Sequence, residues 1–276
     1  MRRRRSVVAR VRRPLGFAAL WLLRIGAFAL LFSPILLVIV LSFGGDAFTS
    51  IPPHSYSLRW YRNIFARDEF VSSFVTSLTV ALIAMPVSVL LGTSSAYALW
   101  KRPSSATWLL ESALMSPVLL PLVVTGLALL VFFTRVHFYA GLASIVIAHV
   151  IITYPYSFRA VLAALSRYDR QLDEAAASLR VRPLASFLHV TMPMIRPGLF
   201  AGALFAFVMS FDDFATTIFL ITPDTKTLPI AIYQYMEFNL DPTVSAVSSL
   251  LVLVAVVGVL LVERTIGMDR FIGLRA

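Results

Sequence analysis

The sequence predicts an all-α integral membrane protein with six transmembrane helices, and three observations support this prediction. Of the 276 residues, 59% are hydrophobic and 14% are charged, and the mean hydropathy is +0.84, far from the balance of an ordinary soluble domain. The apolar residues form runs that are long enough to cross a bilayer of ~30 Å as helices. The net charge is +10, but the charged residues lie between and beside these apolar runs, which argues against nucleic-acid binding.

Six apolar runs are the predicted spans. They cover residues 17–43, 72–100, 106–133, 138–158, 197–221 and 243–262. Pro34 and Pro86 are expected to bend the first two spans. Pro117 and Pro121 lie in the third span, and a proline leaves a helix carbonyl without its usual donor. We therefore expect the third span to pack inside a bundle, where neighbouring groups replace that donor.

The first run follows a basic tail, and this order also describes a secretory signal. However, the run is long enough to cross the bilayer, and residues 42–50 show no small-x-small cleavage pattern. An uncleaved span is therefore predicted. Arg24 and Glu111 lie near the starts of the first and third spans. We expect each of them to form an ion pair or to extend toward the membrane surface.

The distribution of Lys and Arg predicts that both termini are cytoplasmic. In that orientation 19 of these 24 residues lie on the cytoplasmic side. The predicted parts are a cytoplasmic tail, a six-helix domain and a second cytoplasmic tail, at residues 1–16, 17–264 and 265–276. The longest cytoplasmic loop is 159–196, and the exterior loops are 44–71 and 222–241. An amphipathic helix is predicted at 228–238.

Motifs for catalysis are absent from the sequence. There is no G-x-x-x-x-G-K-[ST] for ATP, and the four histidines form no H-E-x-x-H. The spacing supports no Ser–His–carboxylate set, and zero cysteines exclude disulfides and thiolate sites. We therefore predict no catalytic residue, metal ligand or bound cofactor in this chain. A transport function is favoured, because a membrane enzyme or an assembly scaffold would need a polar cluster that the sequence does not display.

The longest polar stretch between two apolar regions runs from Tyr168 to Pro193. Residues 171–179 are good helix formers with two acids near the start. Pro183 suits the first position of a second helix, where its missing N–H costs nothing. Pro193 and Pro197 are expected to end that helix. The stretch therefore predicts a helix–break–helix that offers a shaped surface to a partner.

This stretch resembles the EAA loop of permease subunits in binding-protein-dependent ABC importers. The family pattern is E-A-A, three residues, G, nine residues and I-x-L-P. Here Glu174-Ala175-Ala176 is followed, at the same spacing, by Arg180 and by Val190-Thr191-Met192-Pro193. The glycine position holds Arg180. Since a positive-φ turn is costly for arginine, we expect a different backbone geometry at this break.

The resemblance extends over nearly the whole chain and looks most like the second permease subunit of the spermidine/putrescine branch. The other matching segments are Ser57–Tyr61, Ser116–Pro117, Ser210–Asp213 and Leu228–Pro229. The resemblance implies a type I ABC importer permease fold in a bacterial cytoplasmic (inner) membrane. It also implies that the EAA helix docks on a cytoplasmic ATPase. The residues expected at this coupling surface are Asp173, Glu174, Ala175, Ala176, Leu179, Arg180 and Pro193.

The implied partners are a second permease subunit, two ATPase subunits that hold ATP and Mg²⁺, an extracytoplasmic substrate-binding protein and membrane lipid. A heterodimer of permease subunits is favoured over a homodimer. The alternative is an ATP-independent channel or ion-coupled carrier, in which the EAA loop would be dispensable. Six spans are fewer than usual for a secondary transporter that is built from paired repeats.

A pair of carboxylates, Asp212 and Asp213, is the candidate for the substrate path, together with Ser116 and Ser210. Counted from Pro197, Asp212 lies about 22 Å along a helix, in the outer half of the bilayer. A carboxylate at that depth should face a bundle interior or a wet cavity, where it would favour a cationic solute such as a polyamine. Helix-end capping or an intersubunit salt bridge is the alternative role.

The substrate stays open at this level. Polyamine-type relatives often carry an acid after the Ser-Pro of the third span or after its next proline, and these positions hold Val118 and Leu122 here. Iron, phosphonate and sulfate are therefore retained as alternative solutes.

Overall fold

The computed structural model describes residues 4–46, 50–138 and 141–266, and it describes side chains from residue 20 to residue 257 outside those gaps. Every regular element within these residues is helical, which confirms the all-α prediction. The predicted tails, 1–16 and 265–276, lie partly outside the described residues. The chain divides into two compact units, residues 68–235 and a second unit formed by the two ends of the chain.

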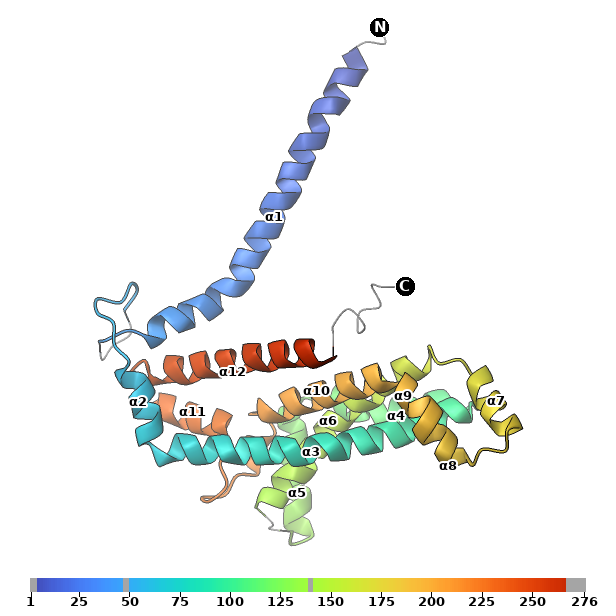
Figure 1. Ribbon diagram of the computed structural model, residues 1–276. Coiled ribbons are helices and arrows are strands. Elements are labelled where there is room, and N and C mark those ends of the chain that lie inside the picture. The colour runs from blue at the N-terminus through green and yellow to red at the C-terminus, as the bar shows by residue number, and fades with distance from the viewer. Residues whose placement is uncertain (1–3, 47–49, 139–140, 267–276) are drawn as a thin grey trace. The chain divides into compact units, whose positions relative to one another are not determined.

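Three helices form the centre of the unit 68–235. They are α3 (Asp68–Lys101), α6 (Leu142–Leu165) and α10 (Arg196–Phe211), and each packs against the other two (Figure 1). Small residues allow this close packing. A Cβ added at Gly92 would lie 2.6 Å from the backbone nitrogen of Phe158, and one at Gly198 would lie 2.8 Å from the carbonyl oxygen of Ala160. Small side chains of this kind let membrane helices approach closely.

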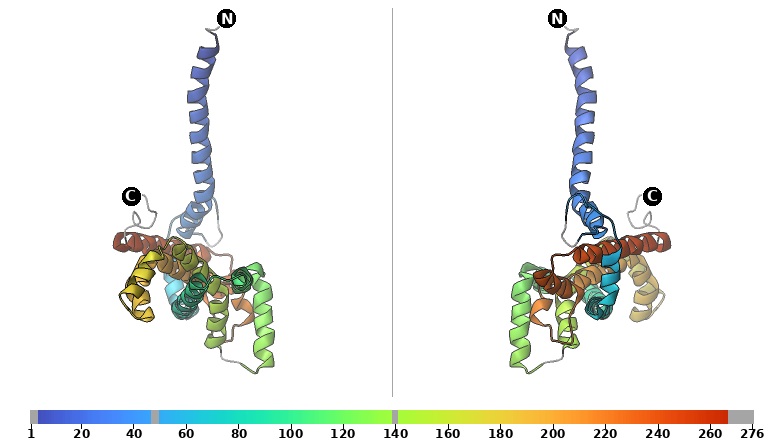
Figure 2. Two further views of the ribbon diagram at one scale, coloured as in Figure 1. Left: turned by 90° about the vertical axis from the view of Figure 1, so that its right-hand side faces the viewer. Right: turned by 90° about the vertical axis from the view of Figure 1, so that its left-hand side faces the viewer.

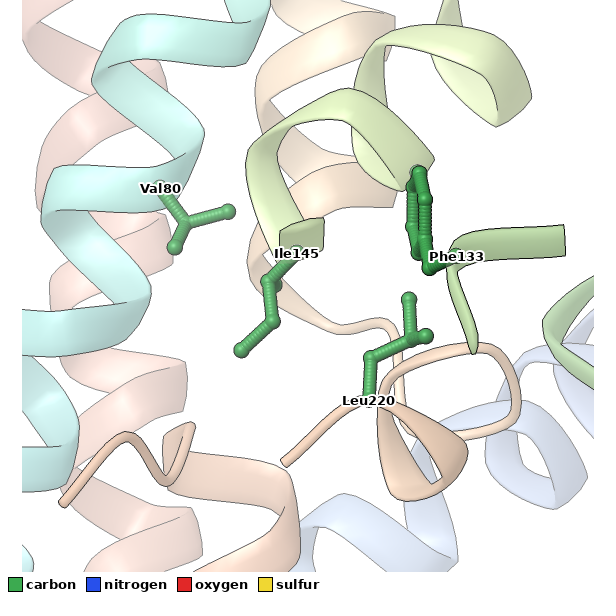
Figure 3. Close-up of a cluster of buried hydrophobic side chains, with 5 residues drawn as sticks. Val80, Phe133, Ile145 and Leu220 are labelled. Carbon is green, nitrogen blue, oxygen red and sulfur yellow. The ribbon is translucent and has the colours of Figure 1, made fainter. Parts of the chain in front are cut away.

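Two apolar clusters fill the space around α6. The first contains Ala148 and four residues whose side chains point toward one another in Figure 3, namely Val80, Phe133, Ile145 and Leu220. The second cluster consists of Ala96, Phe158, Val161, Leu165 and Ile195. Together these clusters join α6 to the other helices of this unit along most of its length.

The third predicted span is two helices rather than one. Helix α4 (Thr107–Leu119) and helix α5 (Leu122–Arg135) meet at an angle of 96°, and Figures 1 and 2 show α5 leaving the line of α4. The break follows from Pro121, which disfavours helical backbone at Leu120, and Leu120 has ψ 138°. The expectation that this span packs inside the bundle is wrong for α4, which buries none of its residues within the described chain.

The prediction that Pro193 and Pro197 end the second helix is confirmed, since that helix ends at Met194, although Pro193 itself lies inside its last turn. Helix α8 (Pro183–Ser186) continues into a π-helical turn, η1 (Phe187–Thr191), and then into α9 (Met192–Met194). The N–H of Met192 bonds to the carbonyl of Phe187, so the turn before Pro193 is wider by one residue, and a wider turn accommodates a proline ring. The chain bends by 75° only after α9, before α10 begins.

The fifth predicted span, 197–221, is wrong in its extent. Helix α10 ends at Phe211, and an irregular segment leads to a short 3₁₀ helix, η2 (Thr217–Phe219), before α11 (Leu228–Phe238). The helix predicted at 228–238 is confirmed. The side chains that explain the early end of α10 are described below.

The unit formed by the chain ends contains α1 (Arg4–Ser42), α2 (Arg59–Ala66) and α12 (Thr243–Ile266). Helix α12 packs against both α1 and α2. Polar contacts of α2 hold the ends of the other two helices. The hydroxyl of Tyr61 lies 2.7 Å from that of Ser42, and the amide of Asn63 donates to the hydroxyl of Thr243 at 2.9 Å.

The helices are compatible with the six predicted spans. Within the described residues, three helices are individually long and apolar enough to cross a membrane, and counting each bent pair as one span gives five. The apolar stretch Thr243–Val257 of α12 is a shorter candidate for the sixth.

Candidate functional site

Helix α7 (Gln171–Ser178) is the first half of the predicted coupling loop, and it lies beside α8 at one end of the α3–α6–α10 bundle (Figure 1). The carboxylate of Asp169 accepts from the N–H of Gln171 at 2.9 Å, which satisfies one of the donors left free at a helix start. Asp173 and Glu174 lie in the first turn, where negative charge suits the helix dipole. The helix–break–helix prediction is confirmed, with Pro183 at the start of α8.

The break after α7 has the geometry that the family's glycine would provide. Arg180 has φ +57°, so the expectation of a different geometry is wrong. Two hydrogen bonds close the helix, from the N–H of Arg180 to the carbonyl of Ala177 at 2.9 Å and from the N–H of Val181 to that of Ala176 at 3.1 Å. This is the Schellman pattern. The satisfied carbonyls offset the cost of about 1–2 kcal/mol for a left-handed arginine.

Replacing Arg180 with glycine is therefore expected to stabilise the end of α7. The gain is about 0.5–1 kcal/mol, because glycine avoids the left-handed penalty but loses more backbone entropy on folding. In hydrogen–deuterium exchange, peptides that cover residues 176–181 should exchange more slowly in Arg180→Gly. Arg182→Gly is the matched control, because Arg182 has φ −60° and gains nothing from glycine. Equal protection in both variants would contradict this account.

One side of α7 faces the rest of the unit. Ala176 is buried, and the carboxylate of Asp173 accepts from the hydroxyl of Tyr168 at 2.9 Å. The same oxygen accepts from Thr191 at 3.3 Å, and the other lies 3.7 Å from the ammonium of Lys101. Burial raises the pKa of Tyr168, against the opposing effect of its hydrogen bond with Thr191, so its hydroxyl remains a donor. Pro193 lies half-buried in α9.

The other side of α7 is open. Glu174, Ala175, Leu179 and Arg180 are exposed, and the side chain of Leu179 is exposed to 79%. Leu184 at the start of α8 is exposed to 70%. We define these five residues as the α7 surface. An exposed leucine pair beside a carboxylate and small alanines is suited to contact with another protein.

The second candidate region is the end of α10, where Asp213 is buried. Its carboxylate accepts from the N–H of Thr217 at 2.9 Å and from the N–H of Thr216 at 3.2 Å. It also accepts from the hydroxyl of Thr217 at 2.9 Å. Asp213 therefore caps η2, which is the helix-end role weighed for this pair of acids.

His149 of α6 extends this arrangement. Its Nε2 lies 2.8 Å from the hydroxyl of Thr217, and its Nδ1 lies 2.7 Å from the hydroxyl of Ser210. The hydroxyl of Thr217 donates its only proton to Asp213, so in the contact with His149 the oxygen of Thr217 is the acceptor. The Nε2 of His149 therefore carries the imidazole proton, and its Nδ1 accepts from the hydroxyl of Ser210. This Ser210–His149–Thr217–Asp213 chain is hereafter the buried network. It fixes the end of α10 against α6 and explains why the helix stops at Phe211.

The other two predicted path residues lie outside the buried network. Asp212 is exposed, and its side chain has no hydrogen bond or ion pair within the described part of the chain. Ser116 is exposed on α4. The structure thus brings Ser210 and Asp213 together and leaves Asp212 and Ser116 free to meet another molecule. A path role for these four residues stays a prediction.

The two helix breaks meet beside Asp212 and Asp213. The hydroxyl of Thr216 lies 3.5 Å from the carbonyl oxygen of Leu122, at the start of α5. A Cβ added at Gly126 would lie 2.8 Å from the carbonyl oxygen of Thr216. Non-helical backbone at membrane depth persists only where protein buries it or where it lines a wet cavity. At this junction the non-helical backbone is therefore expected either to be covered by protein or to line a wet cavity.

Several residues of these sites escaped the sequence analysis, namely Lys101, His149, Tyr168, Thr191 and Thr217. Of these residues, only His149 could have been identified from the sequence, because it is an isolated titratable residue in an apolar span. The ion pair expected for Glu111 is confirmed, since Arg159 donates to it at 2.8 Å. No group of three His, Asp or Glu side chains placed to hold a metal occurs among the described residues.

Comparisons with known proteins agree with this architecture. The family model for the binding-protein-dependent transport system inner membrane component matches residues 64–265. The putrescine transport system permease protein PotI of Escherichia coli (strain K12) is 30% identical over 234 residues, which cover 81% of this chain and 82% of PotI. The spermidine/putrescine transport system permease protein PotC of the same organism is 26% identical, and the match covers 84% of this chain and 88% of PotC.

A solved structure supports the fold. The crystal structure of a bacterial ABC transporter involved in the import of the acidic polysaccharide alginate matches with a TM-score of 0.70 and 15% identity. The match covers 93% of this chain and 96% of that chain. The predicted ABC importer permease fold is thereby confirmed.

Proposed function

The chain belongs to the family of binding-protein-dependent transport system inner membrane components, and from this premise we propose that it forms half of an ATP-driven import pore for a small cationic solute. It is a multi-pass membrane protein of a transport family rather than a catalytic subunit. In this proposal a second permease subunit completes the pore, and two cytoplasmic ATPase subunits bind ATP and Mg²⁺ and hydrolyse ATP. A substrate-binding protein delivers the solute to exterior loops 44–71 and 222–241.

The α7 surface is the observation that carries this proposal. Its exposed leucines and Glu174 lie at the position of the family's EAA loop, between two membrane-spanning regions. Binding of an ATPase there would cover apolar side chains that are otherwise exposed. Both termini are cytoplasmic in this proposal, which is supported by the 19 Lys and Arg residues that then lie inside.

A polyamine is the solute class that we propose. The names of the relatives PotI and PotC specify putrescine and spermidine/putrescine, and Asp212 provides an exposed carboxylate beside the junction of two broken helices. An unpaired carboxylate in a restricted path favours a cation over an anion. Val118 and Leu122 provide no further acid, so iron, sulfate and phosphonate remain alternative solutes, and the two anions serve as competitors in the test.

The experiment is co-purification followed by uptake. The tagged chain is extracted from its native membrane in mild detergent, and the proteins that accompany it are identified. A P-loop ATPase and a second permease subunit are expected. The complex in proteoliposomes should then import labelled putrescine with ATP, and unlabelled spermidine should compete while sulfate and phosphonate should not. A chain that purifies alone and conducts solute without ATP would establish the channel or carrier alternative.

Asp212→Asn is expected to lower polyamine uptake by about tenfold or more, because loss of one charge contact costs roughly 1.5–3 kcal/mol. Assembly with the ATPase subunits should be unchanged, since the exposed side chain of Asp212 makes no hydrogen bond or ion pair within the described part of the chain. Near-normal uptake by Asp212→Asn would remove this residue from the path.

A further inference from the structure

Residues next to α7 reach the end of α3, a helix that is remote from α7 in the sequence. The guanidinium of Arg170 donates to the carbonyl of Trp100 at 2.7 Å and lies over its ring at 4.9 Å. Asp173 of α7 pairs with Lys101 at 3.7 Å. Two independent contacts therefore fasten the coupling loop to the last turn of α3.

Asp173 is the point where three segments meet. While one oxygen pairs with Lys101, the other accepts from Tyr168 before α7 and from Thr191 after it. The carboxylate is 17% exposed and the side chain of Lys101 is 45% exposed, so water weakens the ion pair more than the bonds from Tyr168 and Thr191. Loss of this one side chain would remove the polar contact that α3, the start of the loop and η1 share.

Aromatic side chains stiffen the same contact. Trp100 and Tyr168 meet edge to face with ring centroids 5.4 Å apart, and Tyr97 lies 4.8 Å from Phe187. The ammonium of Lys101 also donates to the hydroxyl of Tyr97 at 3.0 Å. Lys101 is thus held toward Asp173 by a second partner on its own helix.

The other end of α3 contacts the exterior segment before α11. Glu69 pairs with Lys226 at 3.2 Å, and the N–H of Leu228 donates to the buried hydroxyl of Ser77 at 2.8 Å. Helix α3 has 34 residues, which correspond to about 51 Å. One continuous helix therefore connects the coupling loop with the exterior segment of the same unit.

We propose that Asp173 is a positioning residue that makes α7 and the end of α3 move as one body, so that displacement of α7 reaches the exterior segment through α3. This inference rests on the proposed function, because it needs an ATPase that displaces α7. Glu174 and Leu179 then meet the ATPase, while Asp173 passes the movement inward.

The test uses the complete complex with its ATPase subunits and binding protein in proteoliposomes. In Asp173→Ala the complex should assemble and hydrolyse ATP at a basal rate within about twofold of the parent, because the α7 surface is unchanged. Uptake per ATP hydrolysed should fall about tenfold, the scale of a typical coupling free energy. Asp173→Asn keeps an acceptor for Tyr168 and Thr191 but loses the charge. Its uptake per ATP hydrolysed should therefore lie between that of the parent and that of Asp173→Ala.

A covalent rescue separates positioning from folding. The chain has no cysteine, so Lys101→Cys/Asp173→Cys provides one addressable pair in it. Before treatment this variant should show the same low uptake per ATP as Asp173→Ala. A short bis-maleimide that bridges the pair should restore uptake per ATP at least fivefold, and the parent complex treated with the same reagent is the control.

Two results would overturn the inference. Normal uptake per ATP in Asp173→Ala would show that the loop does not act through this carboxylate. Loss of uptake on bridging, with ATP hydrolysis retained, would show that α7 and α3 must separate. Failure of the proposed function itself is a different result, in which no ATPase accompanies the unmodified chain.

Discussion

Glu174→Arg is expected to separate the chain from its ATPase subunits and to lower ATP-driven uptake by about 100-fold. Glu174 is exposed in the first turn of α7, between Asp173, which faces inward, and Ala175, which is also exposed. An ATPase surface that binds the carboxylate of Glu174 presents positively charged or hydrogen-bond-donating groups to it. An arginine facing those groups would weaken binding by several kcal/mol. The cost to α7 itself is smaller, about 0.3–1 kcal/mol for a cation at a helix start.

Co-purification and uptake in proteoliposomes measure this effect. Glu174→Gln removes the charge without reversing it, so this variant should lose less ATPase binding and less uptake than Glu174→Arg. Ser166→Arg introduces an arginine at an exposed residue outside α7 and should leave both assembly and uptake near the parent values. An intact complex with normal uptake in Glu174→Arg would contradict docking through the α7 surface.

Asp213→Ala is expected to cost about 3–5 kcal/mol of stability, the scale for breaking a buried charged network. The substitution leaves the hydroxyl of Thr217 and the N–H groups of Thr216 and Thr217 without their acceptor. These groups are buried, so water does not replace the lost bonds. Within the buried network, the end of α10 would then keep only the Ser210–His149 bond to α6.

The measurement is a thermal melt of the purified chain in detergent, together with the yield of monodisperse protein. Asp212→Ala is the matched control, because it removes the adjacent carboxylate, which is exposed and has no side-chain bond within the described part of the chain. It should melt within a few degrees of the parent, whereas Asp213→Ala should yield little folded protein. Parent-like melting of Asp213→Ala would refute the anchoring role of the buried network.

The pair of aspartates shows how much of the site the sequence predicts. Asp212 and Asp213 were identified as unusual because they are carboxylates at depth in an apolar run, and a path role and a capping role were both predicted for them. The sequence did not show that α10 ends before them, because that end depends on His149, more than sixty residues away. A hydrogen-bond network formed by tertiary contacts leaves no periodic pattern in the chain.

The coupling loop was easier to predict, since its signals are local. Alanines and early acids predicted α7, and Pro183 marked the next helix. The error at Arg180 and the helical position of Pro193 share one cause. Each residue was judged by its intrinsic backbone preference, and in each case hydrogen bonds of neighbouring residues offset the penalty. Such compensation is visible only when the partners of each backbone group are known.

The glycine contacts along α6 limit how this unit can change shape. At Gly92 and Gly198 the backbones of α3 and α10 approach α6 so closely that a methyl group would not fit. Shear, in which packed helices slide past one another, needs interchangeable side-chain contacts, and backbone held against backbone provides none. Rotation about a hinge needs only a few residues with adjustable dihedral angles. The 96° and 75° bends, beside Pro121 and Ile195, supply two such hinges, so α3, α6 and α10 should rotate together as a block during transport.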